Sequence, residues 1–263
     1  MSDADLPLVS VVFVTYNRPH TLVATYETFL FTTDYPRERL ELIVADDGSD
    51  PDVQALVKRL DFDVFCLSVV NRGLGANMNT GLRAAHGEFI LLLQDDWICM
   101  SYPGYLRDAV AALRACPDVG MVVLDAWSGA ITQEVRRLGN IDLRVLTAVS
   151  PDSGLRGRTY TDWPHVKRRD FHDIVGWYLE GAPMTVTENA MTDAVGRQDR
   201  YKAAILEGGA PFTHIGDRYS FNPGRRISRL ETLVSAAPLG RVAIALARRL
   251  RRALRRWTGR EGM

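Results

Sequence analysis

The stretch FILLLQDDW, residues 89–97, joins a run of apolar residues to an acidic pair. Residues 89–93 are apolar on both faces and too few for a helix, so they predict a buried strand. Asp95 and Asp96 then lie at its carboxyl end, where adjacent carboxylates are costly to desolvate unless a cation or hydrogen-bond donors neutralise them. The pattern favours a divalent metal, Mn²⁺ or Mg²⁺, shared with a phosphate-bearing ligand. The alternative is a solvated turn in which an aspartate caps a helix.

Three further strand-then-helix patterns precede this one. Apolar runs predict strands at 9–14, 40–45 and 64–69, and each is followed by a polar break and a helical pattern. Four successive units predict an α/β fold with a mostly parallel sheet covered by helices. In such sheets the ligand crevice lies outside the carboxyl ends of the strands.

Polar residues follow each of the four predicted strands. Because the carboxyl ends of parallel strands meet at one edge of the sheet, we expect these side chains to converge on one site. They are Thr15, Tyr16 and Asn17, the Asp46-Asp47 pair, Asn71, and Gln94 with Asp95 and Asp96. Their shared position, more than any one cluster, indicates a binding site.

Two of these clusters carry a more specific signal. A carboxylate within Asp46-Asp47-Gly48-Ser49 is suited to accept hydrogen bonds from a nucleoside, although these residues also fit an Asx-type turn before a helix. Asn71-Arg72-Gly73-Leu74-Gly75 indicates a close approach of the backbone to a ligand near a helix N-terminus, or a bare Gly-rich turn. It is no dinucleotide fingerprint, because Met78 stands where the third glycine would be needed.

Three stretches, in their order and spacing, resemble glycosyltransferase family 2: VSVVFVTYNRPHTL (9–22), ELIVADDGSDP (41–51) and NRGLGANMNTGLRAAHGEFILLLQDDW (71–97). The resemblance covers about the first hundred residues well and the rest loosely. It implies a GT-A fold, a nucleotide-diphosphate sugar donor with UDP as the default nucleotide, Mn²⁺ or Mg²⁺, and transfer with inversion at the anomeric carbon.

The resemblance also implies roles for individual residues. Thr15 and Asp46 or Asp47 match the positions that hold the nucleoside, and Asp95 and Asp96 match the acidic motif that holds the metal and the diphosphate. On this basis we place the sugar-nucleotide site at Thr15, Tyr16, Asn17, Asp46, Asp47, Asn71, Gly75, Asn79, Gln94 and Asp95.

Two positions depart from the family pattern. The acidic motif commonly opens with another acid, where this chain has Gln94, and one charge fewer puts the strength of the metal site in doubt. Many members carry an arginine before the asparagine of the third motif, where Met78 precedes Asn79. Contacts made by that arginine therefore cannot be transferred to this chain.

An inverting transfer needs a carboxylate to take the proton of the acceptor hydroxyl. The stretch GWYLEGAPMTVTENAM offers Glu188, which better matches the family's placement, and Glu180 as the alternative. Glu188 also fits as an acid in the first turn of a helix beginning at Thr187, and Glu180 as a surface acid. His214 resembles a late histidine that completes the metal or phosphate site in some members, or is a histidine satisfied at a strand end.

The second half of the chain is harder to interpret. We expect a nucleotide-sugar-binding core at 1–125, an acceptor-side region completing the same domain at 126–225, and a C-terminal segment at 226–263. Residues 129–165 mix Gly, Pro, Ser and Arg without a clear period and predict a loop-rich insertion. Residues 167–169 predict a solvated basic loop. The further expected elements are a helix at 104–116 and strands at 119–124 and 210–214.

The C-terminal segment predicts a basic amphipathic helix over 241–257. Residues 241–263 hold eight arginines and one glutamate, out of 32 basic and 32 acidic residues in the chain, so the first 240 residues carry a net charge of −7. Such a helix can lie on an anionic membrane surface, pack on the acidic body or remain a solvated tail. The acidic body argues against specific nucleic-acid binding.

Composition favours a cytoplasmic protein. Three cysteines, an odd number, fit a reducing compartment, and neither a secretory signal nor a run of about 18 apolar residues is visible. Attachment at the inner face of the cell membrane through 241–257 would bring the enzyme to a glycan or lipid-linked acceptor. Three rival functions remain: a nucleotidyltransferase, a catalytically inactive sugar-nucleotide-binding module, and a membrane- or nucleic-acid-binding scaffold acting through the tail.

Overall fold

The computed structural model describes residues 3–125, 130–149 and 157–216. Its strands are β1 (Val9–Thr15), β2 (Leu40–Asp46), β3 (Val64–Leu67), β4 (Phe89–Gln94), β5 (Trp97–Cys99), β6 (Val119–Val123), β7 (Thr132–Leu138), β8 (Ile141–Leu146), β9 (His165–Arg168), β10 (Lys202–Glu207) and β11 (Phe212–His214). The α-helices are α1 (Pro19–Thr32), α2 (Pro51–Val57), α3 (Leu74–Arg83), α4 (Tyr105–Ala115), α5 (Phe171–Val175) and α6 (Met184–Gly196). Short 3₁₀ turns lie at Asp3–Asp5 and Arg37–Arg39.

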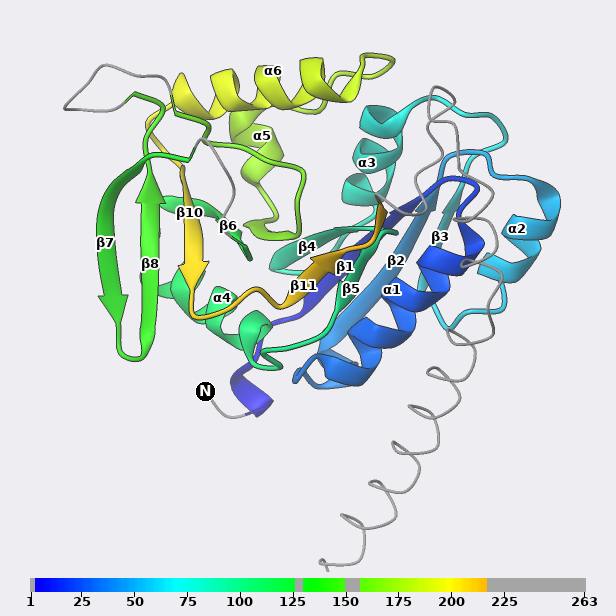
Figure 1. Ribbon diagram of the computed structural model, residues 1–263, viewed down its shortest axis with the longest axis horizontal. Helices are drawn as coiled ribbons and strands as arrows, with labels where there is room; N and C mark the ends of the chain where they lie inside the picture. Colours follow the sequence, from blue (N-terminus) through cyan, green and yellow to red (C-terminus); the bar gives the residue numbers. More distant parts are fainter. Residues whose placement is uncertain (1–2, 126–129, 150–156, 217–263) are drawn as a thin grey trace, which may run out of the picture.

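A mixed sheet of nine strands runs through the described part of the chain in the order β3-β2-β1-β4-β9-β6-β10-β8-β7 (Figure 1). β1 pairs in parallel with β2 and β4, so that Val9 lies beside Leu40 on one side and Phe89 on the other. β8 and β9 run against the other strands. The prediction of a mostly parallel, helix-covered sheet is confirmed.

Helices pack on both faces of the sheet, which explains the unbroken apolar strands. All seven residues of β1 are buried. Phe13 packs with α1, α2 and α4 in one hydrophobic cluster, whereas Val12 and Val14 pack with α3, α5 and α6 in another. Figure 1 shows α1, α3 and α2 around the parallel half of the sheet, and α6 above its other half.

The loop-rich insertion predicted over 129–165 is wrong for much of its described part. β7 and β8 form an antiparallel hairpin that extends the sheet beyond β10. Leu143 and Val145 are buried while Asp142 and Arg144 are partly exposed, so β8 has the two-residue period of a strand with one covered face. Gly139, with φ 67°, and Asn140 form the turn. A Gly-Asn pair between two strands is a hairpin signal that the surrounding charged residues obscured.

The predicted basic loop over 167–169 is also wrong, because Lys167 lies within β9. This strand is inserted between β4 and β6 and hydrogen-bonds to both. The Lys167 side chain is wholly buried; its Nζ lies 2.8 Å from His172 Nε2 and donates to Tyr178 Oη at 3.0 Å. Burial holds the pKa of Lys167 well below its usual range.

α6 begins at Met184, one turn earlier than expected from Thr187. Pro183 precedes the first helical residue, and the Thr187 N–H already donates to its carbonyl. Glu188 therefore lies in the second turn and not among the N-terminal residues of the helix. The simple explanation of Glu188 as a first-turn acid that favours the helix dipole is thereby removed.

The predicted C-terminal helix at 241–257 lies outside the described residues, as does the whole segment 217–263. Strands from both sides of the expected boundary at residue 125 share the one sheet. Among the helices of the described ranges, none combines the length and apolar character needed to cross a bilayer.

Candidate functional site

A cleft of about 290 Å³ opens at the carboxyl ends of β1, β2 and β4 and reaches the first residue of α6. Side chains from all four predicted strand-end clusters line it. They are Thr15, Tyr16, Asp47, Asn71, Gln94, Asp95 and Asp96. Segments up to 81 residues apart in sequence thus meet at one edge of the sheet, as the parallel arrangement of the strands requires.

The acidic pair lies buried at the base of this cleft. Thr15 Oγ1 donates to Asp95 Oδ2 at 2.7 Å, and Thr25 Oγ1 donates to the Asp95 carbonyl at 2.9 Å. β1 and α1 therefore fix both the side chain and the backbone of this residue. Burial raises the pKa of Asp95 to about 6, although the nearby Arg18 charge and the Thr15 hydrogen bond oppose the shift.

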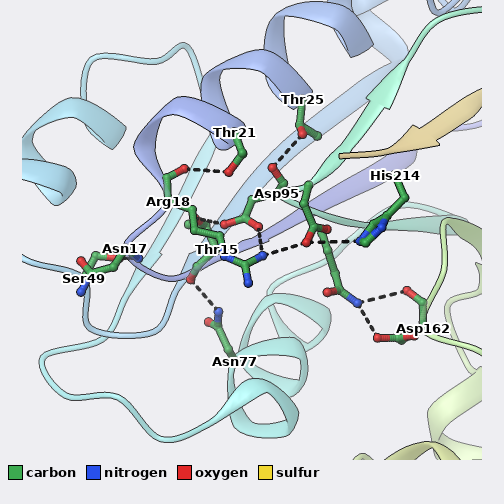
Figure 2. Close-up of polar contacts among 12 residues, drawn as sticks. Thr15, Asn17, Arg18, Thr21, Thr25, Ser49, Asn77, Asp95, Asp162 and His214 are labelled. Atoms are coloured by element: carbon green, nitrogen blue, oxygen red, sulfur yellow. Dashed lines mark hydrogen bonds and ion pairs between the residues drawn. The ribbon is translucent and has the colours of Figure 1, made fainter. Parts of the chain in front are cut away.

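Arg18, in the loop between β1 and α1, forms an ion pair with both carboxylates. Its Nη1 lies 2.8 Å from Asp96 Oδ2 and 3.2 Å from Asp95 Oδ1. Figure 2 shows the Arg18 side chain pointing toward Asp95. A single guanidinium nitrogen thus occupies the position of a cation shared by the pair. The sequence predicted that this pair requires a cation, and within the chain that cation is an arginine.

The remaining oxygens of Asp96 determine whether a metal can fit. Asp96 Oδ1 is buried and has no hydrogen-bond partner in the described ranges, while His214 Nε2 stands 3.5 Å from Asp96 Oδ2. His214 reaches this place because β11 pairs with β5, opposite Trp97. No three acidic, histidine or cysteine side chains in the described segments cluster as a complete metal site. The donors therefore fit Mg²⁺ or Mn²⁺ only if substrate phosphates supply further ligands, as such metals commonly require.

The two aspartates after β2 have different surroundings. Asp46 is wholly buried beneath the loop, where its Oδ1 accepts from the Ser49 N–H at 2.9 Å and from Gln54 Nε2 at 2.8 Å. Asp47 lines the cleft, and its carboxylate accepts the N–H groups of Arg72 and Gly73 at 2.9 and 2.8 Å. Burial raises the pKa of Asp47. Of the pair, Asp47 is the one placed to meet a ligand.

Asn17 and Gly75 lie outside the set of residues that lines the cleft. Asn17, with φ 50°, joins two loops: its N–H donates to Ser49 Oγ and its Oδ1 accepts the Asp50 N–H, both at 2.8 Å. Gly75 packs against the backbone at Leu179, where a Cβ would collide with the Leu179 carbonyl oxygen. The close approach predicted at Gly75 is real, but it is to the chain itself.

Asn79 holds the segment before α6. Its Nδ2 donates to the Tyr178 carbonyl and to Glu180 Oε1, both at 3.0 Å, and its Oδ1 accepts the Tyr178 N–H at 3.1 Å. Glu180 also pairs with Arg72 at 2.7 Å and with Arg83 at 3.6 Å. The Asn79 hydrogen bond and the two arginines lower the pKa of Glu180. This carboxylate is engaged in holding α3 to the segment before α6.

Glu188 belongs to a second, half-buried carboxyl pair. Its Oε1 accepts the Asp162 N–H at 3.4 Å, and its Oε2 lies 3.5 Å from Arg158 Nη2. Asp162 Oδ2 in turn accepts from Gln94 Nε2 at 2.6 Å, so the pair is joined to the lining of the cleft. Burial and the Glu188 carboxylate raise the pKa of Asp162 to about 7.

Comparison with known proteins identifies the fold family. Residues 10–168, more than half of the chain, match the family described as Glycosyl transferase family 2. The chain belongs to glycosyltransferase family 2. The chain is 32% identical over 102 residues to the putative glycosyltransferase EpsH of Bacillus subtilis, covering 37% of this chain and 29% of EpsH. It is 33% identical over 96 residues to the GalNAc(5)-diNAcBac-PP-undecaprenol beta-1,3-glucosyltransferase of Campylobacter jejuni, covering 35% and 30%.

Solved structures share the fold at low sequence identity. TarS 1-349 of S. aureus in complex with UDP-GlcNAc matches with a TM-score of 0.59 and 19% identity, over 91% of this chain and 66% of TarS. The mannosyltransferase PcManGT of Pyrobaculum calidifontis, in complex with GDP-Man and Mn²⁺, matches with a TM-score of 0.55 and 18% identity, over 77% and 57%. The matched part of the chain spans 29–38% of the length of three curated relatives and 7% of a fourth.

Three residues of this family 2 site were not predicted from the sequence. Arg18 was visible as a lone cation in the first strand-end loop, opposite an acidic pair. Asn77 donates to the Thr15 and Ala45 carbonyls at 3.1 and 3.0 Å, and its polar side chain on the buried face of a predicted helix was a usable signal. Asp162 lies in a stretch without a regular spacing of apolar residues, so no local sequence pattern predicted that it would be part of the site.

Proposed function

We propose that this glycosyltransferase moves a sugar, with inversion, from a nucleotide-diphosphate donor to a hydroxyl of a glycan or lipid-linked acceptor, in a metal-dependent reaction. The observation that carries the proposal is the acidic pair at the base of the cleft, with Asp96 Oδ1 buried and unpartnered within the described ranges. A buried carboxylate oxygen without a partner is costly unless a ligand satisfies it. The surrounding side chains are of the kind that binds a nucleoside diphosphate.

In this proposal the nucleoside lies between the first and second strand-end loops. Tyr16 offers a ring that is 36% exposed at the cleft, Asp47 a carboxylate, and Asn71 an amide. Thr15 acts mainly through Asp95, whose carboxylate it holds. Asp46, Asn17, Gly75 and Asn79 would support the site through the loops and segments that they fix.

Asp95 and Asp96, with His214 beside them, would hold Mn²⁺ or Mg²⁺. When bound, such an ion neutralises charge on the diphosphate leaving group. The protein's own contribution is to keep both carboxylates buried and to fix Asp95, whose side chain is held by Thr15 and whose backbone carbonyl is held by Thr25. PcManGT, which shares the fold, is described with GDP-Man and Mn²⁺.

Glu188 is the proposed base, with Asp162 as its partner. The acceptor oxygen would bond to the anomeric carbon as the bond from that carbon to the diphosphate oxygen breaks, and the hydroxyl proton would pass to the carboxyl pair. Gln94 joins Asp162 to the cleft. Glu180 is the weaker candidate because Arg72 and Arg83 hold it as an ion pair.

UDP as the nucleotide and a lipid-linked acceptor are proposed from the relatives. TarS 1-349 is described with UDP-GlcNAc, and the Campylobacter jejuni relative is named as acting on an undecaprenol-linked glycan. A cytoplasmic enzyme with residues 241–257 on the inner face of the membrane would meet such an acceptor. Co-sedimentation of the full chain, but not of a chain ending at Gly240, with anionic liposomes tests this attachment; equal recovery would remove it.

The function itself is tested by measuring donor binding, donor hydrolysis and sugar transfer across UDP-, dTDP- and GDP-sugars, with and without Mn²⁺. We expect one donor to bind in a metal-dependent way and to be consumed. Donor binding that ignores the metal would overturn the metal site. Tight, metal-dependent binding without hydrolysis or transfer to any acceptor would instead identify an inactive sugar-nucleotide-binding module.

A further inference from the structure

Arg18 holds the position that the proposed metal would need. Its Nη1 lies within 3.2 Å of an oxygen from each carboxylate of the acidic pair, and its side chain is 24% exposed, so the guanidinium faces the cleft. A divalent ion bound by Asp95 and Asp96 would lie in contact with this guanidinium. The two groups are both positively charged. At such distances the two cations repel each other strongly, even with the screening found inside a protein.

The backbone at Arg18 is anchored, so the side chain is the part that can move. The Arg18 carbonyl accepts the Leu22 N–H at 3.0 Å and Thr21 Oγ1 at 3.2 Å, which ties it to the first turn of α1. Asn17 before it is fixed to the second loop, and Pro19 follows it. In contrast, only the two carboxylates hold the guanidinium among the contacts of the described ranges.

A diphosphate offers the guanidinium an equivalent set of partners. Arginine binds phosphate oxygens through paired N–H groups at least as well as it binds carboxylates. A diphosphate that enters the cleft lies within reach of the first loop, because Thr15, Tyr16 and Arg18 all line the same space. Transfer of Arg18 from the acidic pair to the diphosphate would leave both carboxylates free for a cation.

We infer that Arg18 is an exchangeable counter-ion that occupies the acidic pair in the donor-free enzyme and moves to the donor's diphosphate, so that metal and donor bind cooperatively. The inference rests on the proposed function, since it assigns the same pair to a metal. It adds a residue that couples the two binding events: the Arg18 charge competes with the metal for the pair until the donor's diphosphate draws the side chain away. By linkage, the metal must strengthen donor binding by the same factor as the donor strengthens metal binding.

The test measures Mn²⁺ affinity of the full chain by electron paramagnetic resonance titration, without nucleotide and with saturating UDP. For the wild type we expect weak binding of Mn²⁺ alone and at least roughly thirtyfold tighter binding with UDP. Arg18→Gln should bind Mn²⁺ alone at least about tenfold more tightly than the wild type, and the UDP effect should fall to about threefold or less. Arg18→Lys should stay near the wild type, because it keeps the charge.

Arg59→Gln is the matched control, since Arg59 is exposed in the turn after α2 and outside the cleft. Thermal unfolding of each variant shows whether it is folded. Unchanged or weaker Mn²⁺ binding in folded Arg18→Gln, with UDP cooperativity intact, overturns the exchange and leaves the metal site standing. Absence of Mn²⁺ binding in every protein, with or without UDP, overturns both. The transfer screen described above reports independently on the activity.

Discussion

Two carboxyl pairs lie beside the cleft, one buried and one half-buried, and the negative charge of each is offset in a different way. Asp95 and Asp96 share the guanidinium of Arg18. In the second pair, burial and the Glu188 carboxylate raise the pKa of Asp162 to about 7, so we expect these two carboxyls to share one proton at lower pH. An arginine cannot give up its proton in a protein, so the positive charge that it brings to the first pair is lost only if its side chain moves away. The second pair can gain or lose a proton near neutral pH. The first is therefore suited to a metal and the second to general-base catalysis.

Gln94 separates the two pairs. Its side chain donates to Asp162 Oδ2, and its backbone leads directly into the acidic pair. An acid at this position, as the family pattern favours, would have placed a further carboxyl against Asp162. The amide instead supplies a donor that stabilises the ionised form of Asp162 and opposes the shift of its pKa. Gln94, at a position where the family pattern favours an acid, thus affects the Asp162–Glu188 pair as much as the acidic pair that follows it.

The largest effect is expected from removing the charge of the first pair. Asp96→Asn should lower the transfer rate about a thousandfold, roughly 4 kcal/mol, and abolish the metal dependence of donor binding, because the pair loses the carboxylate with the unsatisfied oxygen. Steady-state kinetics and Mn²⁺ titration measure this. Glu38→Gln, which alters an exposed acid, should leave both unchanged. Retention of more than a tenth of the activity by Asp96→Asn would contradict the assignment.

Removing the charge of the second pair should separate catalysis from binding. Glu188→Gln should lower kcat about a hundredfold while the donor Kd stays within about twofold, because a general base contributes to the chemical step and not to donor affinity. Single-turnover transfer and donor titration measure the two quantities. Glu180→Gln is the comparison variant and should lower kcat much less. A larger loss in Glu180→Gln would move the role of base to that residue.

The pH profile should report the shared proton. With the pKa of Asp162 at about 7, the pair holds its proton below this value, so kcat should rise with pH through about 7 and level off above it. Asp162→Asn removes the coupling between the two carboxyls, and the inflection should move down by about one unit or more. Profiles of kcat from pH 5 to 9 test this. The same inflection in both proteins would show that another group titrates.

The smallest effect concerns stability. Since the pKa of Asp162 is raised from 3.8 to about 7, the folded protein binds this proton more tightly than the unfolded chain, and the residue's contribution to stability falls as pH rises between these values. Asp162→Asn lacks this loss. Its free energy of unfolding relative to the wild type should therefore be higher at pH 8 than at pH 4, by roughly 2 kcal/mol. Urea unfolding at both values measures the difference, and a constant offset would refute the proton sharing.

Most of the structure of the first hundred residues could be predicted from the sequence. The apolar runs at 9–14, 40–45 and 89–93 became β1, β2 and β4 with bounds within one residue, because a strand buried on both faces needs an unbroken apolar run. The polar clusters after them line the cleft as parallel geometry requires. The hairpin of β7 and β8 was missed because an edge strand exposes most of its residues and loses the apolar signal.

The sequence by itself determined the parallel core, the edge of the sheet that carries the site, and the acidic pair that needs a cation. Each of these follows from burial or chain direction, which local patterns of residues specify. Only the tertiary structure decided that Arg18 is the cation, that Asp162 joins Glu188 to Gln94, and that Lys167 is buried. These pairings join residues far apart in the chain, and they depend on strand order and loop path, which no local pattern encodes.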